Sequence, residues 1–408
     1  MADFCIKDPI YNEINFKDDE WAFQLLQTKE LIRLQNINQL GISNKIFPSA
    51  TNSRFSHSIG TFEIAKRFSK HLISKFSITE YERKLFLATA LLHDIGHGPF
   101  SHVFEIITKI KHEDFTKSII LDKNLQVNKI LVNFGLDPLD IVSVLFGTYK
   151  KEWISKLISS NLDVDRIDYM LRDAYFLGTH YSTIDVNFLV ERTYIIDNNV
   201  YFQADSSNII ESFLLGRYYM HNDIYDNLNT YSYEWCLKMI FTRLKEISDK
   251  FIFFREKIYY YDLFSWIIFD KLPSNEIFIE LHDYNFYSFI SSLQFIGDKI
   301  LDSFVLYFLY GNYDGNNKFI EFANYSQILE NKLIEDSKET KIDAKYLFLV
   351  FKKASKDYYS IEKKSIILLF DNEKNIIFEF PYKDILELKN EKTNKNEKII
   401  LLNKKIFF

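Results

Sequence analysis

Apolar side chains recur at helical spacing through most of the first 310 residues, and this periodicity limits the chain to a mainly α architecture. One case begins at Arg54, where Ile59, Phe62 and Phe68 fall on one face of a predicted helix. Only 11 glycines and 6 prolines interrupt the 408 residues, so the helices should be ordered and closely packed. We also predict helices over about 18–40, 79–93, 207–229 and 232–255.

Beyond about residue 310 the pattern changes to short apolar runs separated by turns rich in Lys, Asp and Asn, which is typical of strands. The runs are Tyr346–Phe351, Ser365–Phe370, Ile376–Phe380 and Ile399–Leu402. A small hairpin is expected within residues 192–204, around Asn198-Asn199. We therefore divide the chain into a helical core (1–230), a helical extension (231–310) and a smaller mixed α/β C-terminal region (311–408).

The stretch Leu91–His102 concentrates candidate metal ligands. It contains His93, Asp94, His97 and His102, together with a Gly98-Pro99 turn that ends the preceding helix. Imidazole and carboxylate groups both bind divalent cations. A His-Asp pair is nevertheless most often an exposed polar dipeptide, so this interpretation requires ligands from elsewhere in the chain.

Two candidates for the missing ligands are His57 and Asp165. Nitrogen and carboxylate ligands that leave positions open for water suit a divalent ion that promotes hydrolysis. Each residue also has an ordinary explanation, because a single histidine is usually a satisfied core or surface residue and Asp165 could cap its helix.

Two later segments place polar side chains four residues apart, which puts each set on one helix face. The sets are Asp165, Tyr169 and Asp173, and then Arg217, His221 and Tyr225. Either set alone would ordinarily be a solvated face. Their occurrence in one chain with the His-Asp pair favours a shared site.

Charge and cysteine content restrict the functional class. A net charge of −6 and a pI near 5.9 oppose binding to a nucleic-acid backbone. Two cysteines cannot supply a disulfide framework or a structural zinc site, which suits a reducing cytoplasm. No apolar run is long enough to span a membrane. We expect a cytoplasmic protein with neither a membrane nor a nucleic acid as its partner.

Three motifs carry a resemblance to a known family. They are Arg54-Phe55-Ser56-His57-Ser58-Ile59-Gly60, the segment Leu92–His102, and Asp163-Val164-Asp165-Arg166-Ile167-Asp168-Tyr169. In order and spacing they resemble the motifs of HD-domain phosphohydrolases. More narrowly, they resemble the deoxynucleoside triphosphate triphosphohydrolases, the dGTPase-like branch that includes the vertebrate SAM- and HD-domain enzyme. The resemblance covers roughly residues 6–230, and it implies an HD-type catalytic core there.

The resemblance assigns a role to each motif residue. The metal ligands would be His57, His93, Asp94 and Asp165. The catalytic residues would be His102, Glu105 and His112, together with Asp94. Substrate would contact Gln39, Leu40, Arg54, Arg166, Tyr169, Asp173, Arg217, His221 and Tyr225. Within that set, the resemblance places Leu40 against the 2′ edge of the sugar and Asp173 at its 3′-hydroxyl.

The resemblance implies hydrolysis of deoxynucleoside triphosphates to deoxynucleoside and triphosphate. One divalent ion would take part, and iron, manganese, zinc, nickel and magnesium all suit the ligands. A homo-oligomer, dimer or tetramer, is also implied. The alternatives are another HD phosphohydrolase activity, such as a 5′-deoxynucleotidase or nucleotide phosphodiesterase, and a non-catalytic nucleotide-sensing scaffold.

Overall fold

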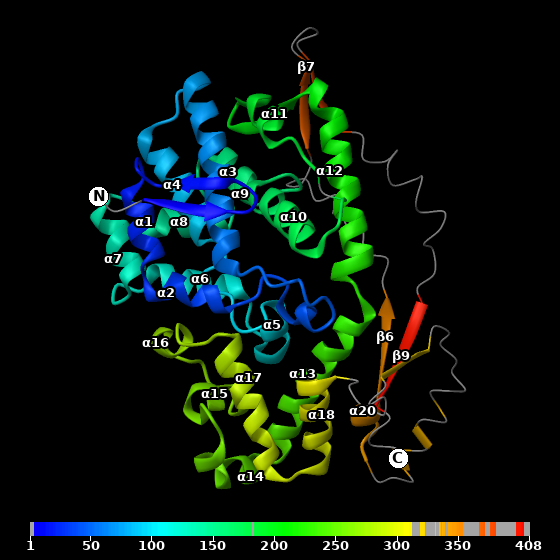
Figure 1. The fold of residues 1–408 in the computed structure, drawn as a ribbon. Helices are drawn as coiled ribbons and strands as arrows, with labels where there is room; N and C mark the ends of the chain where they lie inside the picture. The colour runs from blue at the N-terminus through cyan, green and yellow to red at the C-terminus, as the bar shows by residue number, and fades with distance from the viewer. Residues whose placement is uncertain are drawn as a thin grey trace.

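The computed structural model describes residues 4–181, 183–311, 319–322, 331, 334–335, 337–338, 342–353, 367–371, 376–380 and 397–403. Helices dominate residues 4–311, and small sheets lie at the N-terminus and along one side of the molecule (Figure 1). The mainly α class predicted from the sequence is confirmed.

The core begins with a two-stranded hairpin and continues as a helical bundle. Its elements are β1 (Cys5–Asp8), β2 (Asn12–Asn15), α1 (Glu20–Leu26), α2 (Lys29–Ile32), α3 (Arg54–Lys75), α4 (Glu80–Leu92), α5 (His102–Thr108), α6 (His112–Leu121), α7 (Gln126–Asn133), α8 (Pro138–Leu145), α9 (Glu152–Ile158), α10 (Val164–Leu177), α11 (Val186–Glu191), β3 (Thr193–Ile196), β4 (Asn199–Gln203) and α12 (Ser207–Met220). Two 3₁₀ turns, Arg33–Asn36 and Gly41–Lys45, precede α3.

Helix α3 is the central helix of this bundle and packs against α4, α10 and α11. It starts where the Ser53 hydroxyl accepts the Ser56 N–H, and α4 starts at a capping box formed by Thr79 and Glu82. Phe62 and Phe68 on α3 are buried, as the periodicity predicted. The predicted helix over 79–93 and the hairpin within 192–204 are likewise confirmed.

Three predicted helices are wrong because each is interrupted. The helix over 232–255 ends at Glu246, and a separate helix begins at Ser248. The helix over 18–40 breaks at Gln27, since the Thr28 side chain caps a new helix by accepting the Leu31 N–H. The helix over 207–229 ends at Met220 and passes into one π-helical turn, His221–Tyr225. Asn227 then caps the next helix, which therefore begins before the predicted residue 232.

The helical extension lies below the core in the view of Figure 1 and consists of α13 (Leu228–Glu246), α14 (Ser248–Phe253), α15 (Tyr261–Ile268), α16 (Asn275–Phe278), α17 (Asp283–Ser292) and α18 (Lys299–Tyr310). Helix α13 packs along α18 and also contacts α5 of the core. The Phe104 ring on α5 lies 6.0 Å from Trp266 and 6.3 Å from Phe286, so aromatic packing joins the two units.

One carboxylate of the extension holds two loops of the core. Asp283, at the start of α17, accepts the backbone N–H of Asn38 at 2.9 Å and that of Phe100 at 2.8 Å. Phe100 and Ser101 both have positive φ angles, 55° and 56°, which are uncommon for residues with side chains. The bond from Phe100 therefore helps to keep a strained turn in place directly before α5.

In the C-terminal region, the described elements are β5 (Phe319–Phe322), α20 (Ala344–Leu347), β6 (Phe348–Lys353), β7 (Leu368–Asp371), β8 (Ile376–Glu379) and β9 (Glu397–Asn403). The described parts of the four predicted apolar runs overlap β6, β7, β8 and β9, except that Tyr346 and Leu347 are helical. Ser365 and Ile366 of the second run lie outside the described residues. Strand β7 pairs in parallel with β4 of the core hairpin, giving the sheet order β3-β4-β7-β8. The boundaries at residues 230 and 310 stay predictions.

Among the described residues, no helix combines the length and the apolar character that crossing a membrane requires.

Gly60 is required by the packing of α3 on α10. A Cβ atom there would lie 1.9 Å from Asp168 Oδ1 and 2.3 Å from Arg172 Nη2, two atoms of a buried ion pair. Gly60→Ala should therefore lower the free energy of unfolding by about 1–3 kcal/mol or more, the usual cost of overpacking. Urea denaturation followed by circular dichroism measures this change. Lys70→Ala, at an exposed position of α3, is the control and should change it by less than about 0.5 kcal/mol. Wild-type stability of Gly60→Ala would contradict the packing.

Candidate active site

Four side chains from α3, from the turn directly after α4 and from α10 approach one another. We call His57, His93, Asp94 and Asp165 the metal cluster. His57 Nε2 lies 3.2 Å from His93 Nε2 and 3.0 Å from Asp165 Oδ1. Asp94 Oδ1 lies 3.4 Å from His93 Nε2, and Asp94 Oδ2 lies 3.6 Å from His57 Nε2. Ligands bound at about 2.1 Å stand about 3.0 Å apart at right angles. The ligand atoms of His57, His93 and Asp94 all lie within 4.8 Å of one another and fit a single ion, and Asp165 is a further candidate beside the two imidazoles.

The Nδ1 atom of each imidazole in the metal cluster makes a hydrogen bond to an acceptor outside the cluster. His57 Nδ1 donates to Asp168 Oδ2 at 2.8 Å, and His93 Nδ1 donates to the carbonyl of Ala90 at 2.8 Å. A neutral imidazole has one N–H, so both Nε2 atoms then present lone pairs to the cluster. Two lone pairs and two carboxylates facing one another repel unless a cation lies between them. This donor set is that of a divalent metal site.

The pKa values of His57 and Asp94 indicate which charge the metal cluster stabilises. Burial disfavours a charged imidazole there, but hydrogen bonds with Asp165 and Asp168 outweigh it and raise the pKa of His57 to about 10. Burial similarly opposes ionisation of Asp94, yet Arg54 and the neighbouring imidazoles hold the pKa of that carboxyl well below its usual range. With no metal ion bound, the raised pKa describes a protonated His57 that donates from both ring nitrogens. A metal ion would replace the proton on Nε2, and either one places a positive charge beside the ionised carboxylates.

The sequence prediction named these four ligands but missed the residues that support them. Asp168 accepts from His57, and Arg172 and Tyr11 bind Asp168 in turn. Asp168 follows Asp165 by three residues on the same helix, a spacing that signals proximity to the ligand set. No local signal linked Tyr11 to the site, because its contact spans 157 residues of chain.

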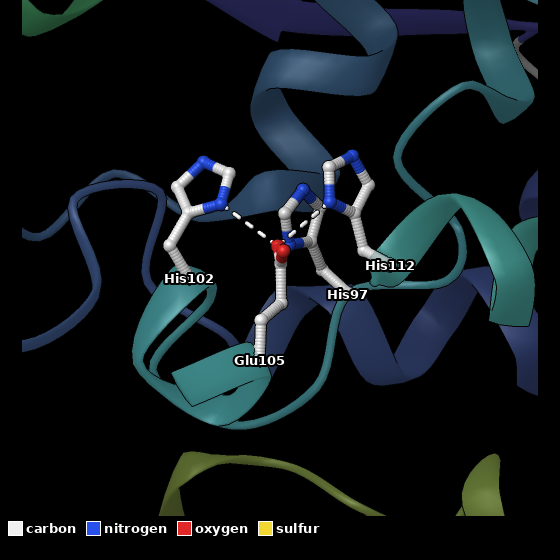
Figure 2. Close-up of side chains that lie close together, drawn as sticks. All are labelled: His97, His102, Glu105 and His112. Atoms are coloured by element: carbon white, nitrogen blue, oxygen red, sulfur yellow. Dashed lines mark hydrogen bonds and ion pairs between the residues drawn. The ribbon is translucent and has the colours of Figure 1, made fainter. Parts of the chain in front are cut away.

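A second cluster lies beside the first. It consists of His97, His102, Glu105 and His112, and we call it the imidazole–carboxylate cluster (Figure 2). Glu105 Oε1 accepts from His102 Nδ1 and from His112 Nδ1, both at 2.8 Å. Burial alone would favour the neutral acid, but these two bonds outweigh it and lower the pKa of Glu105 to about 2. Glu105 is therefore an ionised carboxylate that orients two imidazoles, whose Nε2 atoms stay available for proton transfer.

His97 connects the two clusters. Its Nε2 lies 3.3 Å from Asp94 Oδ1, and its ring stacks on that of His112 with centroids 3.8 Å apart. Burial and the nearby Arg54 and His112 lower the pKa of His97 well below its usual value, so its imidazole is neutral. A neutral His97 can donate to Asp94 while it supports the His112 ring.

Both clusters open into one cavity of about 760 Å³, a volume within the range of small-molecule sites. Its lining includes eight of the predicted substrate residues: Gln39, Leu40, Arg54, Arg166, Tyr169, Asp173, His221 and Tyr225. The ninth, Arg217, is outside that lining, and its Nε and Nη1 are buried with no hydrogen-bond partner among the described residues. The π-helical turn after α12 carries His221 and Tyr225 to the wall.

Two of these substrate residues already have strong protein partners. The Arg54 guanidinium pairs with Asp94 and donates from Nε to Ser101 Oγ at 2.7 Å, which ties the metal cluster to the loop before α5. Asp173 accepts from Asn52 at 2.9 Å and from Tyr225 at 3.0 Å, while burial raises its pKa to about 6. Both side chains are thus held in fixed orientations at the cavity wall.

Comparison with known proteins accounts for this arrangement. The HD domain family model matches residues 54–173, a range that contains all four residues of the metal cluster. The uncharacterized protein MG461 homolog of Mycoplasma pneumoniae is 33% identical over 386 residues, covering 88% of each chain. The chain belongs to the HD-domain phosphohydrolases.

Other relatives extend the comparison. The deoxynucleoside triphosphate triphosphohydrolase SAMHD1 homolog of Dictyostelium discoideum is 29% identical, over 72% of this chain and 61% of that protein. The uncharacterized protein YwfO of Bacillus subtilis is 36% identical, over 63% of this chain and 60% of that protein. The match to each of these two relatives thus leaves more than a third of the relative uncovered.

A crystal structure of a phosphohydrolase from Bacteroides thetaiotaomicron has the same fold, with a TM-score of 0.80 over 98% of this chain and 99% of that one. Sequence identity between the two is 22%. The likeness confirms the architecture predicted from the sequence, an HD-domain helical core with a smaller mixed α/β C-terminal region.

Metal binding to this HD-domain protein should be measurable as stabilisation. A divalent ion that binds the folded chain at a hundred times its Kd stabilises it by about 2.7 kcal/mol. Adding Mn²⁺ to chelator-treated protein should therefore raise the Tm, and His93→Ala should lose most of this rise. His71→Ala is the control, because His71 contacts the Thr193 carbonyl outside the cluster. Equal metal-dependent shifts in the two variants would contradict the site.

Proposed function

We propose that this protein is a dGTPase-like deoxynucleoside triphosphate triphosphohydrolase, which releases deoxynucleoside and intact triphosphate in a metal-dependent reaction. The observation that carries the proposal is the opening of the metal cluster and of the imidazole–carboxylate cluster into one nucleotide-sized cavity. The similarity to the Dictyostelium deoxynucleoside triphosphate triphosphohydrolase homolog supports the same substrate class.

His57, His93, Asp94 and Asp165 would hold the ion. When bound, such an ion supplies Lewis acidity and lowers the pKa of water. The remaining catalytic tasks belong to the chain's own side chains. Glu105 keeps His102 and His112 in place, and Nε2 of one of them delivers a proton to the 5′ oxygen as it leaves. Arg166 and Arg217 neutralise phosphate charge, and the buried, unpartnered nitrogens of Arg217 suit that role.

The sugar-facing part of the proposal rests on Gln39, Leu40 and Asp173, all of which line the cavity. Leu40 offers an apolar side chain and no hydrogen-bond partner to a 2′-hydroxyl, so a ribose would lose hydration without compensation. Asp173 accepts the 3′-hydroxyl, and Tyr169 and Tyr225 pack beside it. The Asn52 and Tyr225 bonds to Asp173 prearrange this acceptor.

Product analysis tests the reaction. Purified protein is incubated with each deoxynucleoside triphosphate and Mn²⁺, with and without a second nucleotide, and the products are separated by chromatography. Deoxynucleoside and triphosphate in equal amounts are expected, and the double variant His93→Ala, Asp94→Ala should release neither. Orthophosphate or pyrophosphate would instead support a 5′-deoxynucleotidase or a phosphodiesterase. Nucleotide binding without any product would support the non-catalytic scaffold.

Glu105→Gln tests the imidazole–carboxylate cluster separately from the metal cluster. An amide cannot supply the charge that orients both rings, so kcat should fall about 10²–10⁴-fold, the usual contribution of general acid–base catalysis. Metal content, measured by mass spectrometry, should stay at the wild-type level. Glu152→Gln, on the exposed face of α9, is the control. Loss of metal in Glu105→Gln would contradict this separation of roles.

We also infer a cytoplasmic setting, which is supported by the scarcity of cysteine, and a homo-oligomeric state, which the family resemblance implies. Light scattering of the full chain measures its oligomeric state directly.

A further inference from the structure

A buried network of charged groups lies directly behind the metal cluster. Asp168 on α10 accepts four hydrogen bonds: from His57 Nδ1 at 2.8 Å, from Arg172 Nε at 3.0 Å, from Arg172 Nη2 at 2.9 Å and from Tyr11 Oη at 2.7 Å. An ionised carboxylate has about four lone-pair sites, so all of its acceptor capacity is used. The carboxylate, and the His57 ring bound to it, are therefore held from several directions.

The N-terminal hairpin completes this network. Arg172 Nη1 donates to Asp8 Oδ2 at 2.8 Å, and Asp8 Oδ1 accepts the backbone N–H of Ile10 and of Tyr11 at 2.9 and 3.1 Å. Asp8 thus closes the turn between β1 and β2 while it anchors that turn to α10. The same turn delivers the Tyr11 hydroxyl to Asp168.

Burial makes these contacts energetically important. Asp168 and Arg172 are 0% exposed, and Tyr11 and Asp8 are 7% and 8% exposed. One guanidinium faces two carboxylates, so the network has an excess of negative charge behind His57. Because these groups are buried, solvent screens that excess only weakly, and it favours a cation on the opposite side of the imidazole.

We propose that Tyr11 and Asp8 of the N-terminal hairpin are positioning residues for metal binding, acting through Asp168 on the orientation of His57. The inference depends on the metal site of the proposed function and is independent of which nucleotide is hydrolysed. Partners behind a histidine ligand fix its tautomer and ring plane, and their loss typically weakens metal binding 10–100-fold. Tyr11 is one hydrogen bond further from His57 than Asp168 is, so the loss of its hydroxyl should weaken metal binding less than the loss of Asp168 would.

A purely structural role is the competing explanation. The Tyr11 ring packs beneath the guanidinium groups of Arg67 and Arg172, 5.2 and 5.8 Å from the ring centroid, and this packing anchors the hairpin by itself. That role predicts a loss of stability when Tyr11 is altered, with no change in metal affinity. The two explanations therefore differ in a quantity that can be measured.

Tyr11→Phe removes the hydroxyl and retains the ring. In the full-length, chelator-treated chain, competition with a chromogenic chelator should give a Co²⁺ dissociation constant about threefold to tenfold higher than in the wild type. The visible spectrum of bound Co²⁺ should shift as the ligand geometry relaxes. At saturating metal, the KM for a deoxynucleoside triphosphate should stay unchanged.

The matched control is Tyr81→Phe. Tyr81 Oη also donates to a carboxylate, Asp140 Oδ2, at 2.6 Å, but this pair links α4 to α8 away from the metal cluster. The control should leave the Co²⁺ affinity and spectrum unchanged, whatever its effect on Tm. Unchanged Co²⁺ affinity in Tyr11→Phe would overturn the proposal, and so would an equal loss of affinity in both variants.

Asp8→Asn provides a second measurement through the Arg172 side of the network. The amide oxygen can still accept from the turn, but the charge opposite Arg172 is lost, so Co²⁺ binding should again weaken. Wild-type affinity in this variant would remove Asp8 from the proposal. Failure of the wild type to bind Co²⁺ would overturn the metal site itself, whereas binding without hydrolysis of deoxynucleoside triphosphates would overturn only the proposed activity.

Discussion

The arrangement of the core depends on the repulsion among four electron-rich groups that three helices bring together. The Nε2 atoms of His57 and His93 lie 3.0 to 3.6 Å from each other and from oxygens of Asp94 and Asp165. The hydrogen bonds behind the two neutral imidazoles turn their lone pairs toward one another. Such a cluster is costly to assemble without a cation. Arg54 supplies part of the compensation through its ion pair with Asp94, while the negative charge of the Asp168 network adds to the need for a cation.

The side chains that hold both clusters in place come from distant parts of the chain. The hairpin turn approaches His57 from the N-terminus, and Asp283 on α17 fixes the strained turn that precedes His102. The metal cluster and the imidazole–carboxylate cluster are consequently held by different elements. His97 is the link between them, since it contacts Asp94 and stacks on His112. A shift of Asp94 or His112 would therefore be transmitted to the other cluster through His97.

The sequence was sufficient to predict groups whose spacing is local. Apolar periodicity located α3 and α4, and the family motifs indicated that His57, the His93–Asp94 pair and Asp165 belong to one site. It was insufficient wherever tertiary context decides. Apolar residues at helical spacing continue past Thr28, so the periodicity did not reveal the break between α1 and α2. The π-helical turn after Met220 changes the backbone hydrogen bonds without changing the spacing of the side chains in the sequence. No local pattern marked Tyr11 and Asp8, because their partners lie more than 150 residues away.

The two bonds of Asp283 have a consequence for how this enzyme type can diversify. One carboxylate holds the loop that carries Gln39 and Leu40 and also the turn that leads into His102. The wall proposed to face the sugar and the helix proposed to donate the proton therefore share an anchor from outside the core. If residues 38–41 were replaced by the loop of a relative with another substrate preference, the new loop backbone would be adapted to that relative's own α17. Its N–H group would then not be placed to donate to Asp283. To exchange specificity between family members, the loop and the start of α17 therefore have to be replaced together.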